Sequence, residues 1–567
     1  MSIGRKLSRS VALVVALACS ILVFAGPKDK VNDSEVKFTS RTELVLIPAL
    51  VTDKSGTHIS GLKKEDFTVL ENGVEQKIAT FEEITSDAHR VSRPTNPNEF
   101  SNSLAAGSSA GRITLIVLDL INTPFSDQEY SRKELFKYLS QSVDRTEPTA
   151  LYTLTRNGIN VIHDFTSDPR VLVAALHKVK GDALPMVDRE EDVEAMTGTA
   201  SPDGSAGVDP GAVQTEAQQL QTMLEDSELN FQSFQQRVAI TYTLQGMQQL
   251  SQALAGFPGR KSLIWAGGGF PFSVSDNTMQ LAPAGRDTLS DVLPMYEHTW
   301  QLLNDAQIAL YPLDVKGLQV GSVASASVRN PGKNYGRNVR MKMWNTQSTF
   351  DTFASMTGGR AYYSSNDLVK GFRDAVRDSS EYYMLGYYLD RSNTKSGWRK
   401  LAVKVKREHA EVRARSGFFV TNATIDPESS HDNDIASALE SPLDYTTLSL
   451  VARWNSTESA KEPGKKHIIY EMHVAADPVL INAVDNNHFI LEFVALAKTP
   501  EGKRAELPLD QKIDGHLTPE KLSAVRQKGI SYRGALDLAP GEYTVRFIVR
   551  DDLSGRMGSV SAPLKVE

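Results

Sequence analysis

The chain has 567 residues, of which 40% are hydrophobic and 23% charged, and its formal net charge is -7. Because domains of roughly 100 to 200 residues are typical, a chain of this length is expected to contain about three or four units. The composition is that of a folded soluble protein, and the small negative charge gives no reason to expect nucleic acid or an anionic membrane as a partner.

Residues 1–25 are predicted to be an export signal. Three basic residues among the first ten precede the apolar run VALVVALACSILVFA, which ends in small residues suited to cleavage after Ala25. The run is shorter than the ~20 residues of a typical membrane-spanning helix, so a retained anchor is the alternative. We therefore expect a protein exported to the periplasm or the cell exterior, with no transmembrane segment in the mature chain.

The only cysteine, Cys19, lies inside this signal. It could serve as a lipid-attachment site, although the apolar run continues beyond it. A mature chain that begins after Ala25 has neither a disulfide nor a thiol nucleophile, and its fold must be stable without covalent links.

Residues 36–86 are predicted to form a small β domain. Strand-like runs such as FTVLE and QKIATFEEI are separated by turns, and Asn72-Gly73 is a strong hairpin signal because both central residues of the turn need a positive φ. The stretch that follows, residues 92–111, is rich in Ser, Asn, Pro and Gly, which is typical of a linker.

Residues 112–420 alternate apolar strands, such as RITLIVLDL and KSLIWAGGG, with amphipathic helices. Fully apolar strands between helices indicate a parallel sheet covered on both faces, so a doubly wound α/β domain is expected. The last strands of this block, EYYMLGYYLD and WRKLAVKVKREHAEVRARSGFFV, alternate with period two and are expected to form an added antiparallel strand pair that closes the edge of the domain.

An acidic insertion, residues 181–229, interrupts the α/β pattern and is rich in Gly, Ser, Pro and Gln. Such a segment is either disordered or a functional excursion, and its composition favours disorder. Residues 421–440 are predicted to be a second linker. Regularly spaced strands in residues 441–567 predict a C-terminal β-sandwich-like domain.

One residue at the end of the first α/β strand has the chemistry of a site. A doubly wound sheet binds ligands at the carboxyl ends of its strands, and Asp119 ends the run LIVLD. With oxygens from Asn122 and Thr123, its carboxylate could bind a hard cation such as Mg²⁺. The alternative is that Asp119 and Asn122 accept backbone N–H bonds and cap the turn and the following helix.

Several motifs occur together in an order that resembles a known family. They are LDLINTPFSDQEYSRKELFKYL, DFTSDPRVLVAAL, TLQGMQQLSQALAGFPGRKSLIWAGGGFP, TGGRAYY and YYMLGYYLD. This order is similar to that of the von Willebrand factor type A (vWA)-related proteins found especially in Acidobacteria. The resemblance covers residues 36–420 and implies a vWA fold flanked by N- and C-terminal β modules.

The resemblance also implies a metal site. The family binds Mg²⁺ or Mn²⁺ through an Asp-x-Ser-x-Ser turn, a Thr from a second loop and an Asp from a third. Asp119 matches the first position and Thr123 the last hydroxyl, whereas Ile121 stands where a Ser is expected. The Thr of the second loop corresponds to Thr241 or Thr243.

The third loop, residues 266–269, reads Ala-Gly-Gly-Gly and supplies no acid. Metal ligands are therefore predicted at Asp119, Thr123 and Thr243, in a degenerate site that has lost one hydroxyl and one carboxylate. Apart from Mg²⁺ or Mn²⁺, no cofactor is expected.

No catalytic motif is found in a suitable structural context, so the chain is predicted not to be an enzyme. We expect an exported interaction protein that binds a protein or cell-surface ligand at the loops around Asp119. One alternative is an envelope hydrolase or its accessory subunit, in which Glu190, Glu191 and Asp192 of the insertion supply the carboxylates. Another is a scaffold within an envelope complex.

Overall fold

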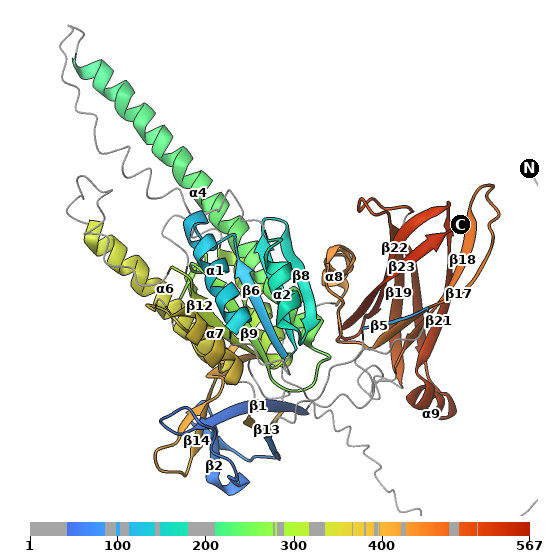
Figure 1. Cartoon of the computed structure of the whole chain (residues 1–567), viewed down its shortest axis with the longest axis horizontal. Coiled ribbons are helices and arrows are strands. Elements are labelled where there is room, and N and C mark those ends of the chain that lie inside the picture. The colour runs from blue at the N-terminus through green and yellow to red at the C-terminus, as the bar shows by residue number, and fades with distance from the viewer. Residues whose placement is uncertain are drawn as a thin grey trace, which may run out of the picture. The chain divides into compact units, whose positions relative to one another are not determined.

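The computed structural model describes residues 42–85, 98–102, 113–141, 148–179, 210–275, 278–280, 289–316, 335–365, 367–378, 381–390, 395, 397–420, 427–475, 487–506 and 508–567. These residues form a mixed α/β protein with several sheets (Figure 1). The expected export signal and residues 190–192 lie outside the described residues.

A five-stranded sheet in the order β12-β9-β6-β7-β8 forms the centre of the α/β part. Four of its strands run parallel, and β8 is antiparallel to β7. The strands are β6 (Ile113–Asp119), β7 (Thr149–Thr155), β8 (Gly158–Thr166), β9 (Lys261–Gly267) and β12 (Ile308–Asp314). A short hairpin, β10 (Ser273–Ser275) and β11 (Thr278–Gln280), follows β9.

Helices cover both faces of this sheet. The side chains of β6 show this, since alternate residues belong to two different hydrophobic cores. Leu115 and Val117 pack with α4, α5 and α6, whereas Ile116 and Leu118 pack with α1, α2 and α7. The helices are α1 (Phe125–Gln141), α2 (Pro169–Leu176), α4 (Pro210–Leu254), α5 (Leu289–Asp305), α6 (Tyr335–Thr357) and α7 (Leu368–Arg377). Apolar side chains on both faces explain the unbroken hydrophobic run of β6.

Two four-stranded sheets share a separate core, and each combines strands from both ends of residues 42–420. Their orders are β15-β1-β13-β4 and β16-β14-β2-β3. The strands are β1 (Thr42–Thr52), β2 (Phe67–Glu71), β3 (Val74–Gln76), β4 (Thr80–Ile84), β13 (Tyr382–Asp390), β14 (Gly397–Val405), β15 (Glu411–Arg413) and β16 (Gly417–Val420). A 3-10 turn, Lys64–Asp66, precedes β2.

This pairing corrects two predictions. Residues 36–86 do not form a self-contained β domain, because β1 pairs with β13 and β2 pairs with β14. The strands β13 and β14 belong to different sheets, so they do not form the strand pair that was expected. Alternating hydrophobicity shows which face of a strand is buried but not which strand lies beside it. The predicted Asn72-Gly73 hairpin is confirmed, with φ values of 48° and 85°.

The C-terminal residues form two further sheets around one core, in the orders β21-β18-β17-β5 and β20-β19-β22-β23. The strands are β5 (Glu99–Ser101), β17 (Leu450–Ser459), β18 (Lys466–Val474), β19 (His488–Lys498), β20 (Leu509–His516), β21 (Ile530–Leu538), β22 (Gly541–Asp551) and β23 (Met557–Val566). The helix α9 (Pro519–Lys528) connects β20 to β21. A strand from the predicted linker 92–111, β5, is thus part of a sheet, which corrects that prediction.

The prediction of a second linker at residues 421–440 is also wrong over most of its length, because the helix α8 spans Pro427–Glu440. Ile435, Ala438 and Leu439 lie on one face of α8 and pack against side chains of β19 and β22. Their spacing of three and four residues is that of an amphipathic helix. The polar residues around these three positions obscured the pattern in the sequence.

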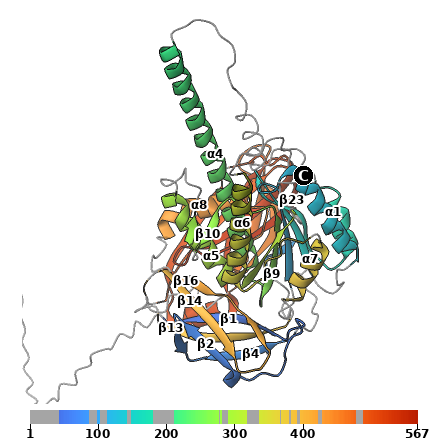
Figure 2. The same cartoon turned by 90° about the vertical axis from the view of Figure 1, so that its left-hand side faces the viewer.

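The helix α4 begins at Pro210, well inside the insertion that the sequence analysis treats as disordered. That prediction is therefore wrong for residues 210–229, while residues 181–209 lie outside the described part of the chain. Figures 1 and 2 both show the N-terminal half of α4 extending beyond the neighbouring helices. None of the described helices is long and apolar enough to cross a membrane.

Candidate functional site at the Asp119 turn

The candidate site lies where β6 ends, at the carboxyl edge of the central sheet. Asp119 is the last residue of β6, and the adjacent parallel strand β9 ends at Gly267 on the same edge. The turn after β6 is buried, with Asp119 only 1% exposed and Ile121 fully covered. A carboxylate in this position faces the protein interior rather than an open ligand groove.

Three N–H groups donate hydrogen bonds to the Asp119 carboxylate. The Asn122 backbone N–H donates to Oδ1 at 3.0 Å, and the Asn122 side-chain amide donates to Oδ2 at 2.8 Å. The indole Nε1 of Trp265, on β9, also donates to Oδ2, at 2.9 Å. Neutral donors from the turn and from the next strand thus surround this carboxylate.

The two predicted hydroxyl ligands lie close to Asp119, but they donate their hydrogen bonds to groups other than its carboxylate. Thr123 Oγ1 donates to the Asp119 backbone carbonyl and accepts from the Gly268 N–H at 2.9 Å. Thr243 Oγ1 donates to Ala239 O at 2.7 Å and accepts from the Asn122 amide at 2.9 Å. The structure therefore brings Asp119, Thr123 and Thr243 together in one hydrogen-bond network, in which Asn122 links Thr243 to Asp119.

The alternative second-loop residue, Thr241, is not part of this network. Its Oγ1 donates to Arg237 O, one turn earlier in α4, at 3.0 Å. Because Thr243 is fully buried and Thr241 is only partly so, the two threonines have different environments although they are two residues apart. This difference resolves the choice that the sequence left open between the two positions.

The glycines after Trp265 are explained by close packing against the turn. A Cβ at Gly267 would lie 3.0 Å from Asp119 Cβ, and one at Gly268 would lie 3.0 Å from Asn122 O. Any larger residue, including the acid that the family pattern expects in this loop, would push the turn away. The small residues at positions 267 and 268 are therefore explained by the close packing of the Asp119 turn.

Burial raises the pKa of Asp119 to about 6, and the hydrogen bonds from Asn122 and Trp265 counteract part of this effect. Desolvation disfavours the charged carboxylate, whereas donors that bond to the charged form favour it. The pKa of Asp119 therefore lies between the ordinary value for an aspartate and neutral pH.

These residues do not fit a Mg²⁺ or Mn²⁺ ion. Such a hard cation needs about six oxygen ligands, but N–H donors occupy the Asp119 oxygens where a cation would bind. One buried acceptor, Asn122 Oδ1, has no hydrogen-bond partner in the described part of the chain, and one amide oxygen cannot replace a coordination shell. The capping alternative is confirmed for Asp119, which accepts the Asn122 backbone N–H, and is wrong for Asn122, whose side chain donates instead.

Two features of this edge were missed by the sequence analysis. The Trp265 indole donor is 146 positions from Asp119, and nothing in the sequence indicates that contact. The second is Asp314, which ends β12 at the same edge, is 8% exposed and accepts from the Lys316 N–H at 3.0 Å. Its place at the end of the apolar run IALYPLD could have been recognised in the same way as that of Asp119.

A different group of side chains with metal-ligand chemistry lies in the C-terminal part. His431, Glu492 and Asp552 place one ligand atom each within 4.8 Å of one another. None of the metal ligands predicted from the sequence is a histidine. The three residues of this group are 61 and 60 positions apart, and His431 falls in a predicted linker, so no local pattern connects them.

Comparison of the sequence with family models and with curated proteins gives no match. Among solved structures, the chain is similar to the crystal structure of the TFIIH p34 N-terminal domain, with 12% identity and a TM-score of 0.19. The match covers 46% of this chain and 96% of that chain. A TM-score this low supports no conclusion about fold or function.

Proposed function

We propose that this chain is an exported, non-enzymatic protein-binding protein built around a vWA-related α/β domain with β modules on both sides. The sequence motifs support the family, and the mixed sheet with helices on both faces is compatible with it. The N-terminal sequence supports export. Mass spectrometry of the mature protein tests export directly, because cleavage after Ala25 leaves Gly26 as the first residue.

The binding surface proposed here is a face of α4 instead of the Asp119 turn. The Asp119 side chain is buried, so it cannot contact a partner. By contrast, Met223, Phe231 and Phe234 of α4 are 71%, 47% and 63% exposed. Residues 8 and 11 positions apart lie on the same broad side of a helix, so these three side chains form an exposed apolar face.

The position of this face follows from the contacts of α4. Thr243 contacts the Asp119 turn through Asn122, and Gln236 Nε2 donates to Pro271 O at 2.8 Å. At ~1.5 Å per residue, the helix from Pro210 to Gln236 extends about 40 Å beyond these contacts. The exposed aromatic residues therefore lie on a projecting helix at the carboxyl edge of the central sheet, as Figure 2 shows for the helix itself.

The partner proposed for this face is an amphipathic α-helix of another protein, with basic residues beside its apolar stripe. An apolar helix face is covered most simply by a second helix. Asp226 is three positions after Met223 and Glu228 is three positions before Phe231, so the sequence spacing makes two acidic residues helical neighbours of the apolar positions. Pairing with a second copy of α4 would bring like charges together, whereas a basic partner would complement them.

A photo-crosslinking amino acid at Phe234, in the full chain expressed in its source cells, tests the site. We expect a discrete adduct that is lost when Phe231 is changed to Glu. Phe125→Glu is the matched control, because Phe125 is 54% exposed and begins α1 beside the Asp119 turn. Peptide mapping should place the crosslink on a helical segment with basic residues.

Two results would overturn this assignment. If the adduct were lost in Phe125→Glu and retained in Phe231→Glu, the binding surface would lie at the Asp119 turn and not on α4. An adduct with twice the mass of the chain, together with concentration-dependent dimerisation in sedimentation that Phe231→Glu abolishes, would make a second copy the occupant. In either case the role of α4 proposed here is wrong.

A further inference from the structure

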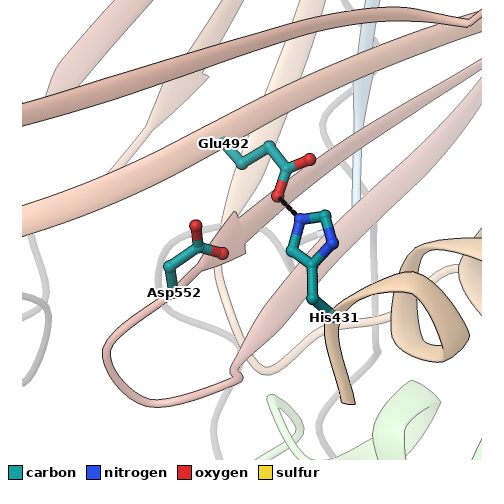
Figure 3. Close-up of side chains that lie close together, drawn as sticks. All are labelled: His431, Glu492 and Asp552. Atoms are coloured by element: carbon teal, nitrogen blue, oxygen red, sulfur yellow. Dashed lines mark hydrogen bonds and ion pairs between the residues drawn. The ribbon is translucent and has the colours of Figure 1, made fainter. Parts of the chain in front are cut away.

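Three side chains from separate segments of the C-terminal part meet at one place, and we call them the His431 cluster: His431, Glu492 and Asp552. His431 belongs to α8, Glu492 to β19, and Asp552 follows β22. Figure 3 shows the imidazole and the two carboxylates facing a common space. His431 Nε2 lies 2.5 Å from Glu492 Oε2, and the ligand atoms of all three residues are within 4.8 Å of one another.

The two carboxylates of the cluster are well shielded from solvent. The side chains of Glu492 and Asp552 are only 2% and 9% exposed. Asp552 Oδ2 is buried and forms an ion pair with Lys512 Nζ at 2.5 Å, so a cation already compensates this oxygen. A metal ion bound by the cluster would take the place of that ammonium group.

The surrounding charges are unbalanced. Four carboxylates gather at this place, namely Glu492, Asp510, Asp552 and Asp434. Among the described residues, Arg550 and Lys512 form ion pairs with members of this group. These four carboxylates outnumber the two cations, which favours the binding of a further cation.

Side chains that hold ligands in place are also present. His431 Nδ1 lies 3.0 Å from Asp432 Oδ1, which directs Nε2 towards Glu492. Arg550 Nη1 donates to Asp552 Oδ1 at 2.6 Å, which fixes the orientation of this carboxylate. Histidine ligands of metals usually donate their other ring N–H to a carboxylate, and ligating carboxylates are usually hydrogen-bonded as well.

The donor set selects the kind of ion. One imidazole nitrogen and two carboxylate oxygens suit Zn²⁺ or a similar transition-metal dication, whereas Mg²⁺ and Ca²⁺ prefer oxygen ligands alone. Ligand bonds of about 2.0 to 2.2 Å would require the three groups to move closer together and Lys512 to turn away. The side chain of Lys512 is 52% exposed, so it has room to do so.

We propose that His431, Glu492 and Asp552 form a binding site for a Zn²⁺-like dication that fastens α8 to β19 and β22. The site has three protein ligands and a fourth position for water. It would serve as a non-covalent crosslink in a chain whose single cysteine is Cys19. Zn²⁺ would replace the proton shared by His431 and Glu492, so binding releases protons and weakens in acid.

The test is isothermal titration of Zn²⁺ into the full-length protein after treatment with a chelator, with Mg²⁺ as the comparison ion. We expect one Zn²⁺ site per chain, at least about tenfold weaker in His431→Ala and in Glu492→Gln. Substitution with Co²⁺ should give the visible absorption of a four-coordinate site. His488→Ala is the matched control, since His488 also pairs with an aspartate, Asp514, at 2.8 Å.

A second variant does not depend on deleting a ligand. Lys512→Met removes the half-exposed cation that contacts Asp552, so Zn²⁺ affinity should increase several-fold if the cluster is the site. The proposal would be overturned if the wild type did not bind Zn²⁺. It would also be overturned if the Zn²⁺ affinity were the same in the wild type, His431→Ala, Glu492→Gln and Lys512→Met. Binding lost in His488→Ala alone would place the ion at His488 and overturn it too.

Discussion

Asp119, at the end of β6, and Glu492, within β19, are both buried carboxylates, and they differ in what surrounds them. Asp119 accepts from the N–H groups of Asn122 and Trp265, which are neutral. Glu492 contacts His431 and lies beside Asp510, so its neighbours are ionisable. A buried carboxylate satisfied by fixed N–H donors is a structural element, whereas one surrounded by excess negative charge is a potential cation ligand.

The pKa directions are consistent with this contrast. Burial raises the pKa of Glu492, and the nearby Asp510 raises it further, while His431 opposes both. For His431, burial lowers the pKa, but the hydrogen bonds to Asp432 and Glu492 outweigh it and raise the pKa. Family resemblance directed attention to Asp119, but the ligand chemistry is better at His431.

The largest expected effect comes from removing the Asp119 carboxylate. In Asp119→Ala, the N–H groups of Asn122 and Trp265 lose a buried acceptor, at about 1 to 3 kcal/mol each. Relief of the buried charge offsets part of this loss, so we expect the free energy of unfolding to fall by roughly 2 to 5 kcal/mol. Chemical denaturation measures it, with Thr241→Ala as the control. Equal stability of Asp119→Ala and the wild type would show that the turn is not held by these bonds.

The pH dependence of stability tests the same carboxylate. Because burial raises the pKa of Asp119 to about 6, the native state binds a proton more tightly than the unfolded state. The extra stability is present below about pH 4 and is lost as the pH rises through about 6, with an upper limit on the order of 3 kcal/mol. Asp119→Asn should lack this component in denaturation curves between pH 4 and 7. Parallel curves for the two proteins would contradict the raised pKa.

Trp265→Phe isolates the donor from the neighbouring strand. The change leaves Asp119 Oδ2 with the Asn122 amide alone, and we expect a loss of about 2 kcal/mol in the free energy of unfolding. Trp454→Phe serves as the control, because Trp454 Nε1 is buried and has no hydrogen-bond partner within the described ranges. If both variants lost the same stability, ring volume rather than the hydrogen bond would explain the result.

In the C-terminal part, His431→Ala removes the partner of a buried carboxylate. We expect a loss of about 1 to 2 kcal/mol at neutral pH without metal, less than that of Asp119→Ala, because the His431 side chain is 26% exposed. Thermal unfolding measured with and without Zn²⁺ sharpens the contrast. Added Zn²⁺ should raise the melting temperature of the wild type and leave that of His431→Ala unchanged.

The smallest expected effect is that of Mg²⁺ or Mn²⁺ on the Asp119 turn. We expect titration of either ion to give the same heat with the wild type and with Asp119→Ala, because N–H donors occupy the carboxylate oxygens. Micromolar binding that Asp119→Ala abolishes would mean that the turn rearranges to admit a cation. That result would contradict the conclusion that Asp119 has a structural role whereas Glu492 is a potential cation ligand.

Much of the central sheet could be predicted from the sequence, because each strand carries its own pattern. The apolar runs of β6 and β9 predict buried parallel strands, and Asp168 and Pro169 predict the start of α2, where Asp168 Oδ1 accepts from the Arg170 N–H at 3.0 Å. The position of Asp119 at the end of β6 follows from the same run. These features depend on residues adjacent in the chain.

The sheets that combine distant strands could not be predicted in this way. The pattern of β13 shows that one of its faces is buried, and it contains nothing that selects β1, more than 300 positions earlier, as its neighbour. Similarly, β5 pairs with β17 across about 350 positions. The choice of neighbour depends on the complementary surfaces of the whole fold.

The sequence by itself determined the order of the α/β elements, the hairpin at Asn72 and the absence of an acid from residues 266–269, since each depends on local periodicity or residue type. Only the tertiary structure decided that Trp265 satisfies Asp119 and that Glu492 and Asp552 meet His431. The reason is physical: the role of a carboxylate depends on the dielectric environment and the donors around it, and these come from segments far apart in the chain.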